Sequence, residues 1–192
     1  MIKSFCFFII SILVILSCKN KKTDEEKENQ KFFPVLSFIK SQVANVDTSV
    51  FRIIKIVQKD STSDTTYLKR EEFREAAKDF LTIPDITSDE LKGEYTETKL
   101  FVPDLKQVAL NYMPKEPDKE ISRQEVMIKP DANGDKVQSI FINRITDSKN
   151  GSIQKILFWE VDKQFKIVTL IQSPGKPEKK ETVKVIWNNF SS

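Results

Sequence analysis

IQKILFWEVDKQFKIVTLIQ, residues 153–172, is the segment of this sequence that decides the fold. Residues 153–161 and 164–172 are rich in β-branched and aromatic side chains, which is typical of β-strands. Asp162 and Lys163, the two residues between these runs, fit the tight turn of a β-hairpin. The segment therefore predicts two antiparallel strands joined by a two-residue turn.

Strand-like segments continue on both sides of this hairpin. No helical period returns after residue 91, and turn-forming residues such as Pro103-Asp104 and Asn150-Gly151 separate several of the segments. The other segments are residues 94–102, 106–113, 121–129, 136–145 and 182–187. Strands that follow one another through short turns form an antiparallel meander. We therefore predict a curved antiparallel sheet of about seven or eight strands.

Helical periodicity is confined to two segments that precede the meander. Residues 34–45 and residues 70–81 carry apolar side chains three and four positions apart, as in helices that bury one face. Glu71 and Glu72 stand in the first turn of the second helix, where the helix dipole favours negative charge, and Pro84 ends it. We expect these two N-terminal helices to pack on one face of the sheet, which makes the fold α+β.

The chain between the two helices predicts one more strand and a turn. Residues 49–58 carry β-branched side chains at both odd and even positions. This pattern predicts a strand that is covered on both faces, although a helix fits the same run. The polar residues 59–65 that follow are typical of a turn.

Composition excludes several classes of function. The chain has no histidine, so neither a Ser-His-Asp triad nor a His-ligated zinc site can be built from it. Its four glycines do not spell a phosphate-binding or dinucleotide-binding loop. The 31 Lys and Arg are balanced by 28 Asp and Glu with the signs well mixed, which indicates a solvated surface and not a nucleic-acid site. We expect no catalytic residue, no cofactor, no metal and no nucleic-acid partner.

Three aromatic residues of the predicted sheet are candidate binding residues. Trp159, Trp187 and Tyr112 could line a concave face of the sheet and bind an apolar or sugar ligand. The alternative is that they belong to the core, because large aromatic rings supply much of the buried area in a protein. Neighbouring residues of a strand point to opposite faces, so only one of Phe158 and Trp159 can lie under the helices.

A second set of residues could support catalysis. A pair of carboxylates is the requirement for acid-base hydrolysis of glycans. The candidates are Glu94, Glu97, Glu125, Glu160 and Asp162. With 28 acidic residues in the chain, pairs of this kind are expected by chance. A carboxylate-dependent hydrolase acting on glycans is therefore an alternative function.

The first residues have the layout of a secretory signal. Lys3 is followed by an apolar run over residues 5–16 and by a small-residue junction at Cys18. A helix of about a dozen residues would be ~18 Å long, which is short of the ~30 Å hydrocarbon core of a bilayer. We therefore expect residues 1–17 to be a cleaved signal peptide and not a permanent membrane span.

The sequence ILSC, residues 15–18, resembles the lipobox of bacterial lipoproteins. The resemblance implies that signal peptidase II cuts before Cys18, that the thiol of Cys18 carries a diacylglycerol, and that its amino group carries a further acyl chain such as palmitate. Two or three acyl chains hold a protein firmly on a membrane. Because Cys6 leaves with the signal and Cys18 carries lipid, the mature chain is expected to have no disulfide.

Residues 18–31 are expected to be the lipidated cysteine and a flexible tether. The residues after Cys18 are mostly Lys, Asp and Glu and include no apolar side chain, so they cannot bury enough surface to order themselves. Lys19 follows the cysteine, and the resemblance to lipoproteins then implies that the protein is anchored in the outer membrane. The anchored domain could lie on the periplasmic face or on the cell surface. Residues 32–192 are expected to be a single α+β domain.

With its signal, tether and layout, the whole chain resembles the small lipoproteins of Bacteroidetes-type bacteria. The leading hypothesis is a membrane-anchored, non-enzymatic binding or interaction protein of the bacterial envelope, which uses one face of a curved sheet. Its expected partners are the membrane, through Cys18, and a protein or apolar ligand. Besides the hydrolase, a structural or assembly lipoprotein is a further alternative.

Overall fold

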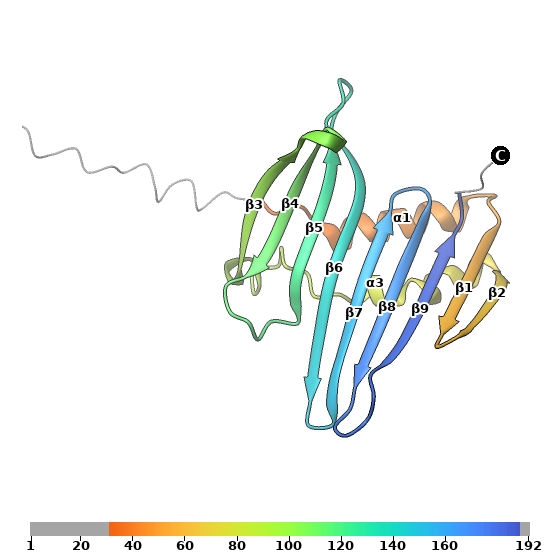
Figure 1. The fold of residues 1–192 in the computed structure, drawn as a ribbon. Helices are drawn as coiled ribbons and strands as arrows, with labels where there is room; N and C mark the ends of the chain where they lie inside the picture. The colour runs from red at the N-terminus through yellow and green to blue at the C-terminus, as the bar shows by residue number, and fades with distance from the viewer. Residues whose placement is uncertain (1–30, 189–192) are drawn as a thin grey trace, which may run out of the picture. The chain divides into compact units, whose positions relative to one another are not determined.

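Nine strands form one open antiparallel sheet in the computed structural model, which describes residues 31–188 (Figure 1). The strands are β1 Ile53–Lys59, β2 Thr62–Leu68, β3 Tyr95–Val102, β4 Gln107–Pro114, β5 Ile121–Lys129, β6 Lys136–Ser148, β7 Gly151–Glu160, β8 Gln164–Gln172 and β9 Lys179–Ile186. Their order across the sheet is β2-β1-β9-β8-β7-β6-β5-β4-β3. The predicted meander is thus β3 to β9, and the β1–β2 hairpin extends it beside β9.

The helices lie on one side of the sheet, and Figure 1 shows α1 and α3 behind the strands. They are α1 Val35–Thr48, α2 Arg70–Ala76 and α3 Lys78–Leu81, and two 3-10 turns occur at η2 Lys92–Glu94 and η3 Pro103–Leu105. The four buried residues of α1 are spaced four, four and three apart, so one stripe faces the sheet: Val35, Ile39, Val43 and Val46. The α+β class with one antiparallel sheet is therefore confirmed.

Aromatic rings from the helices and the strands form the centre of the core. Phe73 of α2 and Phe80 of α3 pack edge-on against Trp159 of β7, with ring centroids 6.4 and 5.2 Å away. Phe165 of β8 and Trp187, which follows β9, complete the cluster, and all five residues are buried. Large rings of this kind bury much apolar area, so this cluster packs α2 and α3 firmly on the sheet.

Two predictions of the number of elements are wrong. The sheet has nine strands and not seven or eight, because the polar segment predicted as a turn contains most of β2. The residues of β2 before Leu68 are exposed, so the sequence shows no alternation of apolar and polar residues there. Strand β2 is defined instead by its pairing with β1. The predicted helix 70–81 is two short helices, because the backbone at Ala77 leaves helical geometry with φ −91° and ψ 4°.

The strand predicted over residues 49–58 begins later than expected. Strand β1 starts at Ile53, and Val50 and Phe51 before it are exposed. Only Ile53 is fully buried in β1, whereas Ile54 and Ile56 are half-buried on the face that the helices do not cover. The prediction that both faces of this strand are covered is therefore wrong.

Several predictions concern residues that lie outside the described part of the chain. Residues 1–30 include the predicted signal segment, Cys18 and nearly all of the predicted tether, and residues 189–192 end the sequence. Among residues 31–188, none of the helices combines the length and the apolar character needed to cross a membrane.

Candidate functional site

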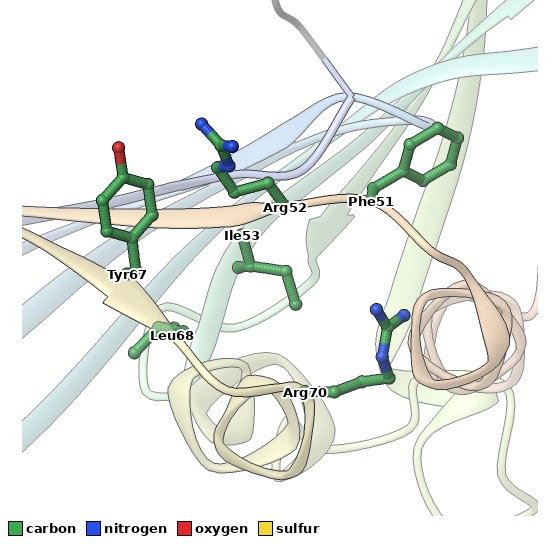
Figure 2. Close-up of a pocket in the computed structure, with 6 residues that line it drawn as sticks. All are labelled: Phe51, Arg52, Ile53, Tyr67, Leu68 and Arg70. Atoms are coloured by element: carbon green, nitrogen blue, oxygen red, sulfur yellow. The ribbon is translucent and has the colours of Figure 1, made fainter.

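A hollow with two arginines lies where the β1–β2 hairpin meets α1 and α2. Its volume is about 410 Å³. Its lining is Phe51, Arg52, Ile53, Tyr67, Leu68 and Arg70, and these residues define what we call the cationic hollow (Figure 2). The lining contains no carboxylate.

Chain connectivity brings these residues together. Helix α1 ends at Thr48, and the exposed segment after it leads into β1, with Val50 93 % and Phe51 43 % exposed. The hairpin then pairs Ile53 with Leu68, so the end of β2 lies beside the start of β1. Helix α2 begins at Arg70, two residues after the end of β2 at Leu68. This short connection places Arg70 near the C-terminus of α1.

Arg70 is held in place by the C-terminus of α1. Its Nη1 donates to the carbonyl oxygen of Val46 and to Oγ of Ser49, both at 3.1 Å. The carbonyl oxygen of Val46 also accepts hydrogen bonds from the N–H and the Oγ of Ser49, so Arg70 is a further donor there, and its positive charge interacts favourably with the negative end of the helix dipole. The guanidinium group of Arg70 is therefore fixed at the wall of the cationic hollow.

Arg52 is the more accessible of the two arginines. Its guanidinium carbon lies 5.5 Å from the centroid of the Tyr67 ring, which is the geometry of a cation-π contact. Within residues 31–188 neither Arg52 nor Arg70 forms an ion pair with a carboxylate. The exposed guanidinium group of Arg52, a planar donor without a carboxylate partner among the described residues, therefore favours a carboxylate or phosphate from outside the chain.

The cationic hollow is open and not an enclosed chamber. Figure 2 shows Arg52 and Tyr67 on one side of the β1–β2 hairpin, and Ile53 and Arg70 on the other side. A ligand would therefore lie around the start of β1, with its charged group near a guanidinium group. The lining contains no His, Asp, Glu, Lys or Cys side chain.

A smaller cavity of about 180 Å³ adjoins the cationic hollow and shares Phe51 with it. Its lining is Asn45, Val46, Ser49, Phe51, Asp162, Trp187 and Asn188. Asp162 lies in the β7–β8 turn, where its φ of 60° is left-handed. It is the only one of the five predicted carboxylates that lines either of these two cavities.

The predicted aromatic binding residues lie in the core. Trp159 and Tyr112 are 0 % exposed and Trp187 is 2 % exposed, so none of them presents a ring face to solvent. Trp187 reaches only the lining of the smaller cavity. Phe158 is half-buried and pairs with Phe141 on the opposite face of the sheet, as the alternation of side chains along a strand requires.

Tyr112 makes a buried polar contact with the N-terminal segment. Its hydroxyl oxygen accepts a hydrogen bond from the backbone N–H of Phe33 at 3.0 Å. Burial, with a smaller contribution from the negative charge of Glu97, raises the pKa of Tyr112 to about 12. The residue therefore stays a neutral phenol at physiological pH and fastens the entry of α1 to the sheet.

The four predicted glutamates are each paired with a cation. The closest N···O distances are 3.1 Å for Glu94 with Lys119, 3.1 Å for Glu97 with Lys99, 2.5 Å for Glu125 with Arg123 and 2.7 Å for Glu160 with Lys163. The hydrogen bond from Lys163 holds the pKa of Glu160 below its usual value. Glu97 lies on the face that the helices cover, and Glu125 and Glu160 lie on the other face. Neither of the two cavities described above therefore contains two of the five carboxylates.

The residues of the cationic hollow were not predicted from the sequence. Arg52 lies in the predicted strand 49–58, Tyr67 follows the predicted turn 59–65 in a segment without an assigned element, and Arg70 is the first residue of the predicted helix 70–81. No local signal in the sequence marks these residues, because Val50 stands four positions after Val46 and so continues the apolar spacing of α1. Comparison of the chain with protein-family models, with curated proteins and with solved structures gave no match.

Proposed function

We propose that this chain is a membrane-anchored, non-enzymatic binding lipoprotein of the bacterial envelope, and that it binds an anionic group in the cationic hollow. The anchor in this proposal is the acylated Cys18, for which the evidence is the lipobox-like sequence of residues 15–18. The observation that carries the binding part is the exposed guanidinium group of Arg52 beside the ring of Tyr67, in a lining without a carboxylate.

The neighbouring side chains narrow the class of ligand. Phe51 and Tyr67 are 43 % and 68 % exposed, and Val50 beside them is 93 % exposed. Apolar surface of this kind gains free energy when a ligand covers it. A ligand with a carboxylate or phosphate next to an apolar or aromatic portion would use both features, because the guanidinium group of Arg52 would bind its charge and the neighbouring ring of Tyr67 its apolar part.

Benzoate and its neutral analogue benzamide test this specificity by calorimetric titration. We expect benzoate to bind the chain, purified from membranes in detergent, with a dissociation constant that is roughly millimolar for a ligand of this size. Benzamide has the same shape without the charge, so it should bind at least about fivefold more weakly, which corresponds to ~1 kcal/mol. Equal binding of the two compounds would contradict an anion site.

A matched pair of arginine variants assigns the binding to the cationic hollow. Arg52→Gln keeps a polar side chain but removes the charge, and should weaken benzoate binding at least about fivefold. Arg123→Gln is the control, because Arg123 lies on β5 and pairs with Glu125 outside the cationic hollow. If both variants bind benzoate equally well, the site lies elsewhere.

The anchor needs a separate experiment. Cells that express Cys18→Ala and cells that express Cys6→Ala are labelled with a palmitate analogue. Cys6→Ala should be labelled like the unchanged chain, because Cys6 lies in the predicted signal segment, whereas Cys18→Ala should lose the label. Labelling of Cys18→Ala at the level of the unchanged chain would refute the lipoprotein part of the proposal.

A further inference from the structure

Strand β3 is an edge of the sheet, and none of the strands described between residues 31 and 188 pairs with its outer side. The N–H of Lys115 donates to the carbonyl oxygen of Glu94 at 2.8 Å, which makes these two residues a hydrogen-bonded pair at the end of the β3–β4 ladder. Hydrogen-bonded and non-bonded pairs alternate along an antiparallel ladder. The even-numbered residues of β3 therefore bond to β4, and the odd-numbered residues from Tyr95 to Phe101 direct their N–H and C=O groups to the edge.

The same edge exposes apolar side chains. Leu100 is 61 % exposed, Phe101 56 % and Leu105, in the turn after β3, 56 %. Leu100 and Phe101 point to opposite faces because they are neighbours on a strand. An edge strand with free backbone groups and exposed apolar residues is a template for pairing with another strand.

We propose that two copies of this chain pair through β3, antiparallel and with Thr98 at the two-fold axis. In this register Glu97 stands opposite Lys99 of the second copy, and Tyr95 stands opposite Phe101 of the second copy. The two sheets then continue into each other across one isologous contact, in which the same surface of each copy is used. This interaction is independent of ligand binding in the cationic hollow.

Backbone geometry and charge select this register over its neighbours. The residues that direct hydrogen-bonding groups to the edge are odd-numbered, so a pairing must set odd residues opposite odd residues. Moving the two-fold axis by one residue along β3 then shifts the partner of every residue by two positions. A register centred on Glu97 sets the two Glu97 side chains against each other. A register centred on Lys99 sets the two Lys99 side chains against each other. Like charges directly opposite destabilise a sheet, whereas opposite charges stabilise it.

Glu97 has capacity for a second cation. Its side chain is 2 % exposed, and its Oε1 lies 3.1 Å from Nζ of Lys99 in an orientation that forms no hydrogen bond. A buried carboxylate oxygen without a hydrogen-bond donor is unfavourable. The side chain of Lys99 is 62 % exposed and free to move toward a second copy. Pairing about Thr98 brings a second ammonium group to each Glu97.

The other edge of the sheet provides a control. Strand β2 carries one charged residue, Asp64, and no cation to pair with it in a second copy. Thr65 of β2 is an exposed edge threonine like Thr98 of β3. A cysteine at either position tests self-pairing of its own edge.

Disulfide cross-linking tests both the pairing and its register. Thr98 pairs with itself as a non-bonded pair, in which Cα atoms lie about 4.5 Å apart, within the ~4.4–6.8 Å that a disulfide spans. Thr98→Cys, Thr65→Cys, Leu100→Cys and the unchanged chain are each treated with diamide, which accepts the two electrons and two protons released. We expect Thr98→Cys to form covalent dimers at least tenfold faster than the other three. Cross-linking of Leu100→Cys in preference to Thr98→Cys would overturn the register.

Sedimentation of chains without new cysteines gives an independent measurement. The unchanged chain should dimerise in a concentration-dependent manner. Lys99→Glu should weaken this dimer at least tenfold, because each Glu97 would then face a carboxylate, while its circular dichroism stays unchanged. The double variant Glu97→Lys with Lys99→Glu restores opposite charges and should recover the dimer. A monomer at all concentrations, together with equal cross-linking of Thr98→Cys and Thr65→Cys, would refute the proposal.

Discussion

Trp159 stacks on Phe165 across the β7–β8 hairpin, with ring centroids 5.4 Å apart and ring planes at 19°. The two residues are direct partners in the register of the hairpin and lie on the face that the helices cover. Phe80 of α3 packs edge-on against both rings, with centroids 5.2 and 5.4 Å away. The hairpin that decides the fold therefore also provides the surface on which the helices pack.

Removal of the Phe80 ring should destabilise the protein strongly. Phe80 is 0 % exposed, so Phe80→Ala leaves a cavity against Trp159 and Phe165. A change of this kind costs about 3–5 kcal/mol in the free energy of unfolding. Leu105→Ala is the control, because Leu105 is 56 % exposed, and it should cost less than about 0.5 kcal/mol. Urea unfolding measures both, and similar losses in the two variants would show that the aromatic cluster does not dominate the core.

Gly151 occupies a position that no side chain can share. Its φ is 133°, and a Cβ built on it would lie 2.1 Å from the carbonyl oxygen of Gln172. Gly134 has a φ of 115° with open space around it, so Gly134→Ala carries the backbone strain without the clash. We expect Gly151→Ala to lower the unfolding free energy by at least about 1 kcal/mol more than Gly134→Ala. Equal thermal shifts in the two variants would place the β6–β7 turn in a different geometry.

The stability of the protein should fall at alkaline pH because of Tyr112. Its pKa is raised from 10.0 to about 12, so the folded protein keeps a proton that the unfolded chain loses between those values. The contribution of Tyr112 is therefore complete below pH 10 and is lost as the pH rises toward 12, by on the order of 1 kcal/mol at pH 11. Urea unfolding at pH 9 and pH 11 should show a smaller decline for Tyr112→Phe than for the unchanged chain. An equal decline in the two proteins would contradict this linkage.

Substitution of Arg70 should lower the stability of the protein more than substitution of Arg52. Arg70→Gln loses both hydrogen bonds to the end of α1 and should lower the unfolding free energy by about 1–2 kcal/mol. Arg52→Gln loses one exposed cation-π contact and should cost no more than about 1 kcal/mol. Thermal unfolding of the two variants checks this order. A larger loss for Arg52→Gln would mean that Arg52, and not Arg70, joins α1 to the hairpin.

Much of the sheet could be predicted from the sequence because its signals are local. Strands β5 and β8 have the predicted bounds, Ile121–Lys129 and Gln164–Gln172, since alternation of side chains and turn residues define them within a few positions. Strand β2 has no such signal, because its residues before Leu68 are exposed and polar. Only its pairing with β1 makes it a strand.

The faces of the sheet and the candidate site depend on contacts that the sequence does not display. Alternation requires Phe158 and Trp159 to face opposite sides, but packing against Phe73 and Phe80 decides that Trp159 is the buried one. The cationic hollow depends on the pairing of β1 with β2 and on the hydrogen bond from Arg70 to the end of α1. These are long-range contacts, so residue type and spacing could not predict the site.

Amide chemical-shift mapping tests most directly whether an anionic ligand binds in the cationic hollow. Benzoate is added to isotope-labelled chain in detergent, and backbone ¹H-¹⁵N signals are followed. The proposal predicts concentration-dependent shifts that are centred on Arg52, Tyr67 and Arg70, and much smaller shifts with benzamide. Shifts centred on another surface, or equal shifts with both compounds, would contradict the proposal.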